Sequence, residues 1–275
     1  MVDSRVKTPV ETSQMPGEQR NLSMAAAATL SQGNFLFRGL APERLQVDEL
    51  EIEKLYSSRP VYTAFRPDLS LHFLYAIVSG GPVVVRSTPL DRIIAMTYPG
   101  GCFGMQNLDF SYGRVSRGFP SLVEAYKTTN VVKIPLSLVK LLYETDAGFR
   151  ERYSLLFELR EKFQYHLLNC STYPPQAVAA LLRSLIYQER SLGMQPMTRG
   201  SHPGAFVFDL PVDLIARACQ LNHRTVEQVI KGMVKAGLVK KTRGNESDWV
   251  IVVDPEGLKE VYGTTRDKVS WWPLK

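Results

Sequence analysis

Side chains that can read a nucleic acid gather in one stretch near the C-terminal end of the chain. An Arg can pair with both acceptors of a guanine edge, and a Gln can pair with an adenine edge. Arg224 and Gln228 lie four residues apart, so a helix would present both on one face. Lys and Arg neutralise phosphates. The candidate DNA-binding residues are Asn222, His223, Arg224, Thr225, Gln228, Lys231, Lys240, Lys241 and Arg243.

The positive charge of the chain is concentrated in the same stretch. The formal net charge of the 275 residues is +6. From Arg217 to Arg243, seven Lys and Arg residues stand against one acid, Glu227, so this segment alone carries +6. Solvated helix faces usually interleave both signs. A localised excess is typical of a surface that binds a polyanion.

Residues 211–237 predict the two helices that hold these side chains. The inner face of the first helix carries the small residue Ala216, which lets another helix cross closely, and Leu221 fills the turn. Asn222 is the expected N-cap of the second helix. Gln220 stands where such turns usually have Gly in a left-handed conformation. The predicted buried face of the second helix consists of Val226, Val229, Ile230 and Met233.

A basic hairpin is predicted to follow the second helix. Gly237 ends that helix, residues 240–245 carry cations, and residues 249–253 return as a strand. The whole segment predicts a winged helix-turn-helix. Arg224 and Gln228 are expected to read base edges, with His223 at an edge or on a phosphate and the other candidates on the DNA backbone.

The preceding part of the chain predicts a β domain and a long helix. Short strands are expected at 61–65, 72–78, 83–86, 92–97, 122–126 and 131–134, separated by Gly and Pro turns, which favours a β-sandwich or jelly-roll. Residues 147–169 repeat apolar side chains every seven residues. This pattern predicts either a helix that lies on its own domain or a dimer seam made of Phe149, Leu156, Leu159, Phe163 and His166.

The N-terminal residues and the bulk composition complete the prediction. Residues 1–32 show no sustained period and are expected to be a disordered tail, and residues 35–55 to form one or two short helices. The three Cys lack metal-site spacing, so no metal or cofactor is expected. No stretch has the length or the flanks of a membrane span or signal peptide, so we expect a cytoplasmic protein.

With these motifs in view, the chain resembles the Crp/Fnr family, the catabolite activator protein type of regulator. Leu74 to Gly80 and Pro99 to Gly104 are similar to two strand-and-turn motifs of that family, and Leu214 to Val239 to its helix-turn-helix. The family's base-reading positions would fall on His223, Arg224 and Gln228, where two of the three residues differ in chemistry. The resemblance therefore implies an operator that differs from the family's common half-site.

The resemblance implies an α+β chain with four parts. These are a tail (1–32), a double-stranded β-helix, jelly-roll or cyclic-nucleotide-binding-like sensor domain (33–146), a dimerisation helix (147–172) and a winged helix-turn-helix domain (173–275). The expected partners are double-stranded DNA, a second copy of the chain and, for an activator, RNA polymerase.

The nucleotide site departs from the family pattern. Met105 stands where cyclic-nucleotide binders have Glu, and Pro120-Ser121 where they have Arg with Ser or Thr on the phosphate. A buried phosphate without its Arg is costly, so we expect no control by cAMP in the usual way. Arg114 and Arg117 leave room for an unidentified, anionic small-molecule effector. The candidate effector pocket consists of Gly104, Met105, Gln106, Arg114, Arg117 and Ser121.

Two other function classes fit the sequence less well. In the first, the winged helix mediates protein contact and its basic face is incidental. In the second, the β domain is a metal-dependent enzyme of the cupin type. That enzyme needs several converging His residues, whereas only His72 of the four falls in the β domain. We therefore expect no enzymatic activity.

Overall fold

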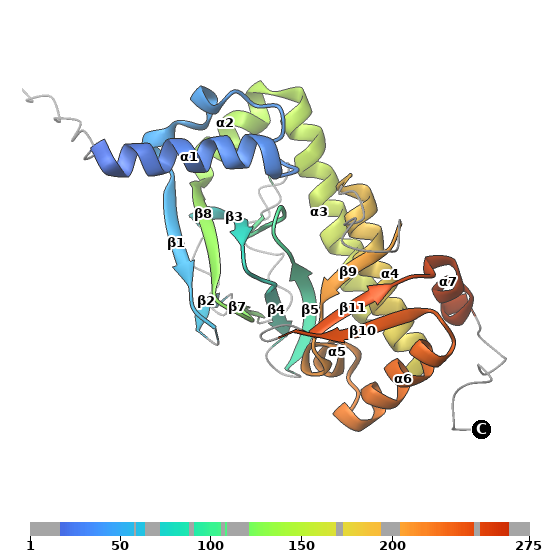
Figure 1. Ribbon diagram of the computed structural model, residues 1–275. Coiled ribbons are helices and arrows are strands. Elements are labelled where there is room, and N and C mark those ends of the chain that lie inside the picture. Colours follow the sequence, from blue (N-terminus) through green and yellow to red (C-terminus); the bar gives the residue numbers. More distant parts are fainter. Residues whose placement is uncertain are drawn as a thin grey trace, which may run out of the picture.

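The computed structural model describes residues 17–57, 59–63, 72–87, 91–105, 108, 121–168, 173–193, 204–244 and 248–263. They form a β-roll, two long helices beside it and a winged-helix unit (Figure 1). None of the helices in these ranges is long and apolar enough to cross a membrane.

The β-roll consists of two four-stranded antiparallel sheets. In the first, β1 (Glu51–Leu55) is followed across the sheet by β8 (Thr129–Pro135), β3 (Phe73–Ser79) and β6 (Cys102–Phe103). The second has the order β2 (Pro60–Thr63), β7 (Ser121–Ala125), β4 (Val83–Ser87) and β5 (Arg92–Thr97). Except for β4 and β5, which are neighbours in the second sheet, successive strands alternate between the sheets, which is the jelly-roll arrangement. The predicted jelly-roll is confirmed, and β1 and β6 are additional to the predicted strands.

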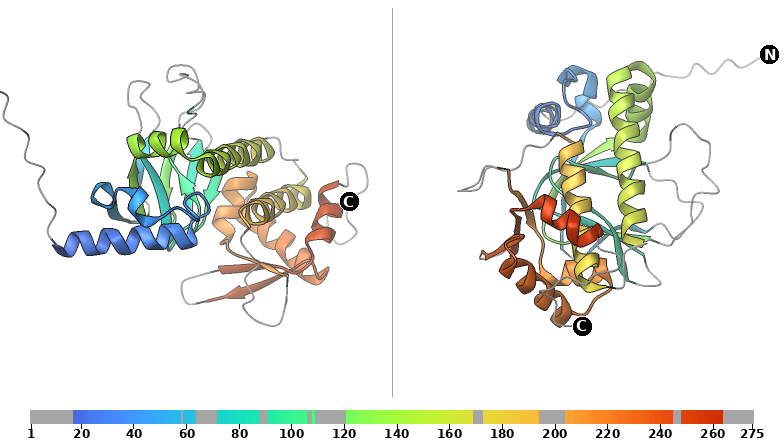
Figure 2. Two further views of the ribbon diagram at one scale, coloured as in Figure 1. Left: turned by 90° about the horizontal axis from the view of Figure 1, so that it is seen from above. Right: turned by 90° about the vertical axis from the view of Figure 1, so that its right-hand side faces the viewer.

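Helices cover one end of the roll. α1 (Gly17–Gly33) and α2 (Leu136–Thr145) lie there with 3₁₀ turns at Pro42–Leu45 and Val47–Glu49 (Figures 1 and 2). The expectation of a disordered tail over 1–32 is wrong from residue 17 on. The buried stripe of α1 is made of Ala26, Ala27 and Leu30. Because Ala is a strong helix former but a weak hydrophobic signal, pattern reading missed this stripe.

The prediction of short helices over 35–55 is correct only in part. The 3₁₀ turns fall inside that range, but residues 51–55 form strand β1. Glu51 to Leu55 pair with Lys133 to Thr129 of β8. A neighbour some eighty residues away in the chain therefore decides the conformation, which local propensity cannot show.

α3 (Ala147–Leu168) runs along the roll, and α4 (Pro174–Ser191) continues into the winged-helix unit. The predicted seam residues Phe149, Leu156, Leu159 and Phe163 are all at most 9% exposed within the single chain. Their assignment to a dimer seam is therefore wrong, because the seven-residue stripe packs on this chain's own core. The side chain of His166 lies outside the described residues.

The winged-helix unit consists of a three-stranded sheet and three helices besides α4. The sheet has the order β10 (Val239–Arg243), β11 (Asp248–Val252) and β9 (Phe206–Asp209). The helices are α5 (Val212–Cys219), α6 (His223–Lys235) and α7 (Pro255–Gly263), and α4 packs against all three. One continuous apolar core joins this unit to the roll.

Candidate nucleic-acid interface

The turn between α5 and α6 is built as the sequence predicts. The Asn222 side chain caps α6, since its Oδ1 accepts a hydrogen bond from the Thr225 backbone N at 2.8 Å. Gln220 adopts the left-handed conformation, with φ of +55°. Its side-chain amide donates to the Arg217 carbonyl at 3.0 Å. This local hydrogen bond offsets part of the strain of a non-Gly residue there.

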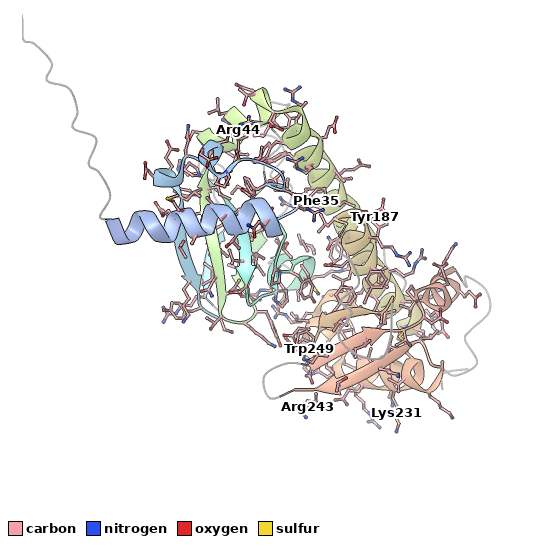
Figure 3. The ribbon with its side chains drawn as sticks, turned by 45° about the horizontal axis from the view of Figure 1, so that its top comes forward. Phe35, Arg44, Tyr187, Lys231, Arg243 and Trp249 are labelled. Carbon is pink, nitrogen blue, oxygen red and sulfur yellow. The ribbon has the colours of Figure 1, made fainter. Side chains whose placement is uncertain are left out.

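α6 separates a buried face from an exposed polar face. Val226, Val229, Ile230 and Met233 are at most 4% exposed, as predicted. Arg224, Gln228 and Lys231 are exposed, while Thr225 is half-buried. Figure 3 shows Lys231 and Arg243 at the same outer edge of the winged-helix unit. Lys231 of α6 and Arg243 of β10 are thus both exposed at this edge of the winged-helix unit.

The hairpin divides its cations between two faces. Lys240, Lys241 and Arg243 are all exposed on β10. Successive side chains of a strand point to opposite faces. Lys241 and Arg243 therefore lie on the same face as Val239, which is buried in the core below α6. Lys240 lies on the other face of the sheet, so the structure does not bring it together with the cations of α6.

Asp213 of α5 contacts the recognition end of α6, and sequence reasoning missed it. Its Oδ1 lies 3.4 Å from Nε2 of His223. Its other oxygen lies 3.5 Å from Nη1 of Arg217. No local pattern gave this contact, because the acid belongs to the preceding helix. Asp213 therefore places a negative charge beside His223, one of the residues expected to contact DNA.

Arg217 belongs to the contact between α5 and the roll, not to the exposed basic surface of α6 and β10. Its Nη2 lies 3.4 Å from Oε1 of Glu124 and 3.4 Å from Oδ1 of Asp91. Arg86 donates to the other Glu124 oxygen at 2.8 Å and also pairs with Asp91. Burial acts to raise the pKa of Asp91, but hydrogen bonds and charge from Arg86 and Arg217 outweigh it and lower that pKa. We call Arg86, Asp91, Glu124 and Arg217 the inter-unit ion cluster.

A second contact joins β9 to the roll. Lys127 forms an ion pair with the Asp209 carboxylate. The Tyr98 hydroxyl donates to the Asp209 carbonyl at 3.0 Å. Burial and the negative charges of Asp209 and Glu189 raise the pKa of Tyr98, so the hydroxyl keeps its proton. The winged-helix unit is thus held on the roll by polar contacts at two separate points.

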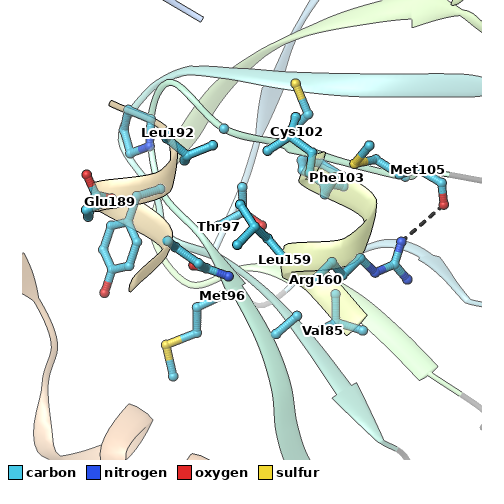
Figure 4. A pocket seen from close by; sticks show the side chains of 17 residues that line it. Val85, Met96, Thr97, Cys102, Phe103, Met105, Leu159, Arg160, Glu189 and Leu192 are labelled. Atoms are coloured by element: carbon cyan, nitrogen blue, oxygen red, sulfur yellow. Dashed lines mark hydrogen bonds between the residues drawn. The ribbon is translucent and has the colours of Figure 1, made fainter. Parts of the chain in front are cut away.

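A cavity lies where the roll, α3 and α4 meet (Figure 4). Its volume is about 60 Å³. Gly104 and Met105 of the candidate effector pocket line it. Gln106, Arg114 and Arg117 lie outside the described residues, as does the Ser121 side chain at the start of β7. Arg160 of α3 donates to the Met105 carbonyl at 3.1 Å, which ties the end of β6 to α3.

Comparison with known proteins decides the fold. No protein-family model matches this sequence, and no curated protein matches it either. FixK2 from Bradyrhizobium japonicum superposes with a TM-score of 0.56 at 15% identity, over 79% of this chain and 99% of that one. A CooA mutant from Carboxydothermus hydrogenoformans gives a TM-score of 0.57 at 14% identity, over 84% and 96%. This chain has the Crp/Fnr fold.

The Crp/Fnr fold accounts for the order of roll, connecting helix and winged helix that the sequence predicted. Met105 is 6% exposed and belongs to the apolar cluster between the roll and its covering helices. A cavity of about 60 Å³ has room for about five water molecules. Met105 lines this cavity, and its thioether is only a weak hydrogen-bond acceptor.

Proposed function

We propose that the protein is a sequence-specific DNA-binding transcription regulator that binds a two-fold symmetric operator as a homodimer and does not respond to cAMP in the usual way. One observation carries the proposal. A capped, exposed recognition helix carries Arg224, Gln228 and Lys231 beside a basic hairpin. The Crp/Fnr fold supports it, because regulators of transcription share this arrangement of roll and winged helix.

The roles follow from the chemistry of the exposed side chains. Arg224 and Gln228 lie one turn apart near the start of α6, the part of such a helix that enters the major groove. We assign them to base edges. The side chain of His223 is 64% exposed and lies beside the Asp213 carboxylate of α5. We assign His223 to a base edge, with that carboxylate orienting its ring. Lys231, Lys241 and Arg243 hold phosphates.

The proposed pairing of two chains uses the exposed side of α3. The buried side is occupied by this chain's own core, as described above. Leu155 is 37% exposed at the edge of that buried side, one turn before Leu159 and one turn after the exposed Glu151. Two chains paired along this side would present two recognition helices. These helices would lie one helical turn of DNA apart. The two-fold symmetry of the dimer would make the operator symmetric.

A salt-dependent DNA titration tests the proposal against the protein-contact alternative. The purified full chain is titrated with a selected duplex and with a scrambled duplex at several salt concentrations. We expect tighter binding to the selected duplex and a log-linear fall of affinity with salt for both. Absence of any salt-dependent DNA binding would favour the protein-contact function.

A further inference from the structure

The imidazole ring of His223 uses only one of its two nitrogens within the protein. His223 is the first residue of α6, and its side chain is 64% exposed. The Nε2 atom lies 3.4 Å from Oδ1 of Asp213 in α5. In the part of the chain that the structure describes, the Nδ1 atom forms no hydrogen bond or ion pair with another residue. The Nδ1 atom is therefore available to a ligand that approaches α6.

The Asp213 carboxylate decides which ring nitrogen carries the hydrogen. A neutral imidazole has one N–H donor, and its other nitrogen is an acceptor. An ionised carboxylate only accepts hydrogen bonds. A hydrogen on Nε2 points to this carboxylate, whereas a lone pair on Nε2 would face a negative oxygen. The neutral ring of His223 therefore keeps its hydrogen on Nε2 and presents Nδ1 as an acceptor.

Asp213 is held in place by its own helix. It lies in the first turn of α5, where the helix dipole favours an acidic side chain. Its Oδ2 lies 3.5 Å from Nη1 of Arg217, one turn further along α5. Arg217 is held in turn by Glu124 of the roll through the inter-unit ion cluster. The carboxylate that faces His223 thus belongs to a network that reaches the roll, rather than to a free surface side chain.

We propose that Asp213 is a positioning residue that keeps the hydrogen of His223 on Nε2, so that His223 accepts a hydrogen bond at Nδ1 from the exocyclic amino group of a cytosine or an adenine. This inference rests on the proposed function. In the major groove, cytosine and adenine display an amino donor, whereas guanine and thymine display only acceptors as hydrogen-bonding groups. Arg224 carries only donors and suits guanine. Two adjacent residues of α6 thus read bases of opposite hydrogen-bonding character.

Base analogues in the selected operator test the proposal. Each adenine is replaced in turn by purine, and each cytosine by 2-pyrimidinone, which removes the exocyclic amino group. Binding of the full-length protein is measured at pH 8, where an imidazole is neutral. At one base pair of each half-site, loss of the amino group should weaken the wild-type protein about fivefold more than His223→Ala. The comparison with His223→Ala cancels the effect of the analogue on the duplex itself.

Two further variants separate positioning from charge. Asp213→Asn keeps the size of the side chain, but its amide can donate to or accept from Nε2, so the fivefold difference should fall below about twofold. Glu227→Gln is the matched control, because Glu227 is an exposed acid one turn after His223 on α6. This control removes the same charge, so it should strengthen binding to all sequences alike and leave the fivefold difference unchanged.

Three outcomes overturn the proposal. Absence of any amino group whose loss depends on His223 would remove the contact. Dependence on His223 of the loss caused by 7-deazaguanine, which lacks the N7 acceptor, would place the hydrogen on Nδ1. An unchanged fivefold difference in Asp213→Asn would remove Asp213 as the positioning residue. Selective operator binding that Arg224→Ala weakens would leave the proposed function standing in each case, whereas a protein that selects no operator would refute that function and this inference with it.

Discussion

Replacing Glu189 by Gln is expected to stabilise the protein at alkaline pH. The ordinary pKa of a Glu side chain is 4.5, and burial raises that of Glu189 to about 7. Between pH 4.5 and about pH 7, the folded protein therefore keeps the proton of Glu189, whereas the unfolded chain has released it. Stability falls as pH rises through this window, by about 3 kcal/mol at most. Gln keeps the size of the side chain and removes the ionisation.

Urea unfolding at pH 5 and at pH 8 measures this effect. Between pH 5 and pH 8, the free energy of unfolding of the wild-type protein is expected to fall by about 2.5 kcal/mol more than that of Glu189→Gln. Glu144→Gln, which removes an exposed carboxylate at the end of α2, serves as the control and should follow the wild type. Parallel pH profiles for the wild type and Glu189→Gln would refute the reasoning, because they would mean that the Glu189 carboxylate remains hydrated in the folded protein.

Four further experiments test the interface and the assembly. Arg224→Ala should weaken binding to the selected operator by about 1–3 kcal/mol and relax the preference at one base pair, as read from binding to single-base operator variants; wild-type specificity would contradict its role. Lys241→Ala should weaken all DNA sequences alike and reduce the salt slope by about 1, and a loss confined to one operator would contradict a phosphate contact. A double-mutant cycle of Arg217→Met and Glu124→Gln, followed by urea unfolding, should give a coupling of about 1 kcal/mol, because the pair lies partly buried at 3.4 Å; strict additivity would argue against the inter-unit ion cluster. Leu155→Glu should shift sedimentation towards the monomer while the exposed Leu141→Glu on α2 does not, and an unchanged dimer would place the pairing elsewhere.

The winged helix was predictable because its signals are local. Asn222, the apolar stripe of α6 and the glycine at residue 237 lie within one stretch, and each acts on its near neighbours in the chain. The strands of the roll were predictable for the same reason, since Gly and Pro turns separate short β segments. The two-residue strand β6 was missed because it is too short to show a period.

Features that depend on distant residues were not predictable. The stripe of Phe149, Leu156 and Phe163 predicts a buried helix face, but the sequence does not tell which surface buries it, and the structure places it against the chain's own core. The inter-unit ion cluster joins residues far apart in sequence, so Arg217 was counted with the DNA-facing cations. α1 was missed because its buried stripe is mostly alanine.

Selection of bound sequences from a random DNA pool tests the central claim most directly. The purified full-length protein is incubated with the pool in the presence and absence of cAMP, and the retained duplexes are sequenced. The account predicts enrichment of one two-fold symmetric site, with the same sequence and the same yield in both conditions. A pool that stays random in both conditions would contradict sequence-specific binding by α6, and enrichment only with cAMP would contradict the altered effector site around Met105.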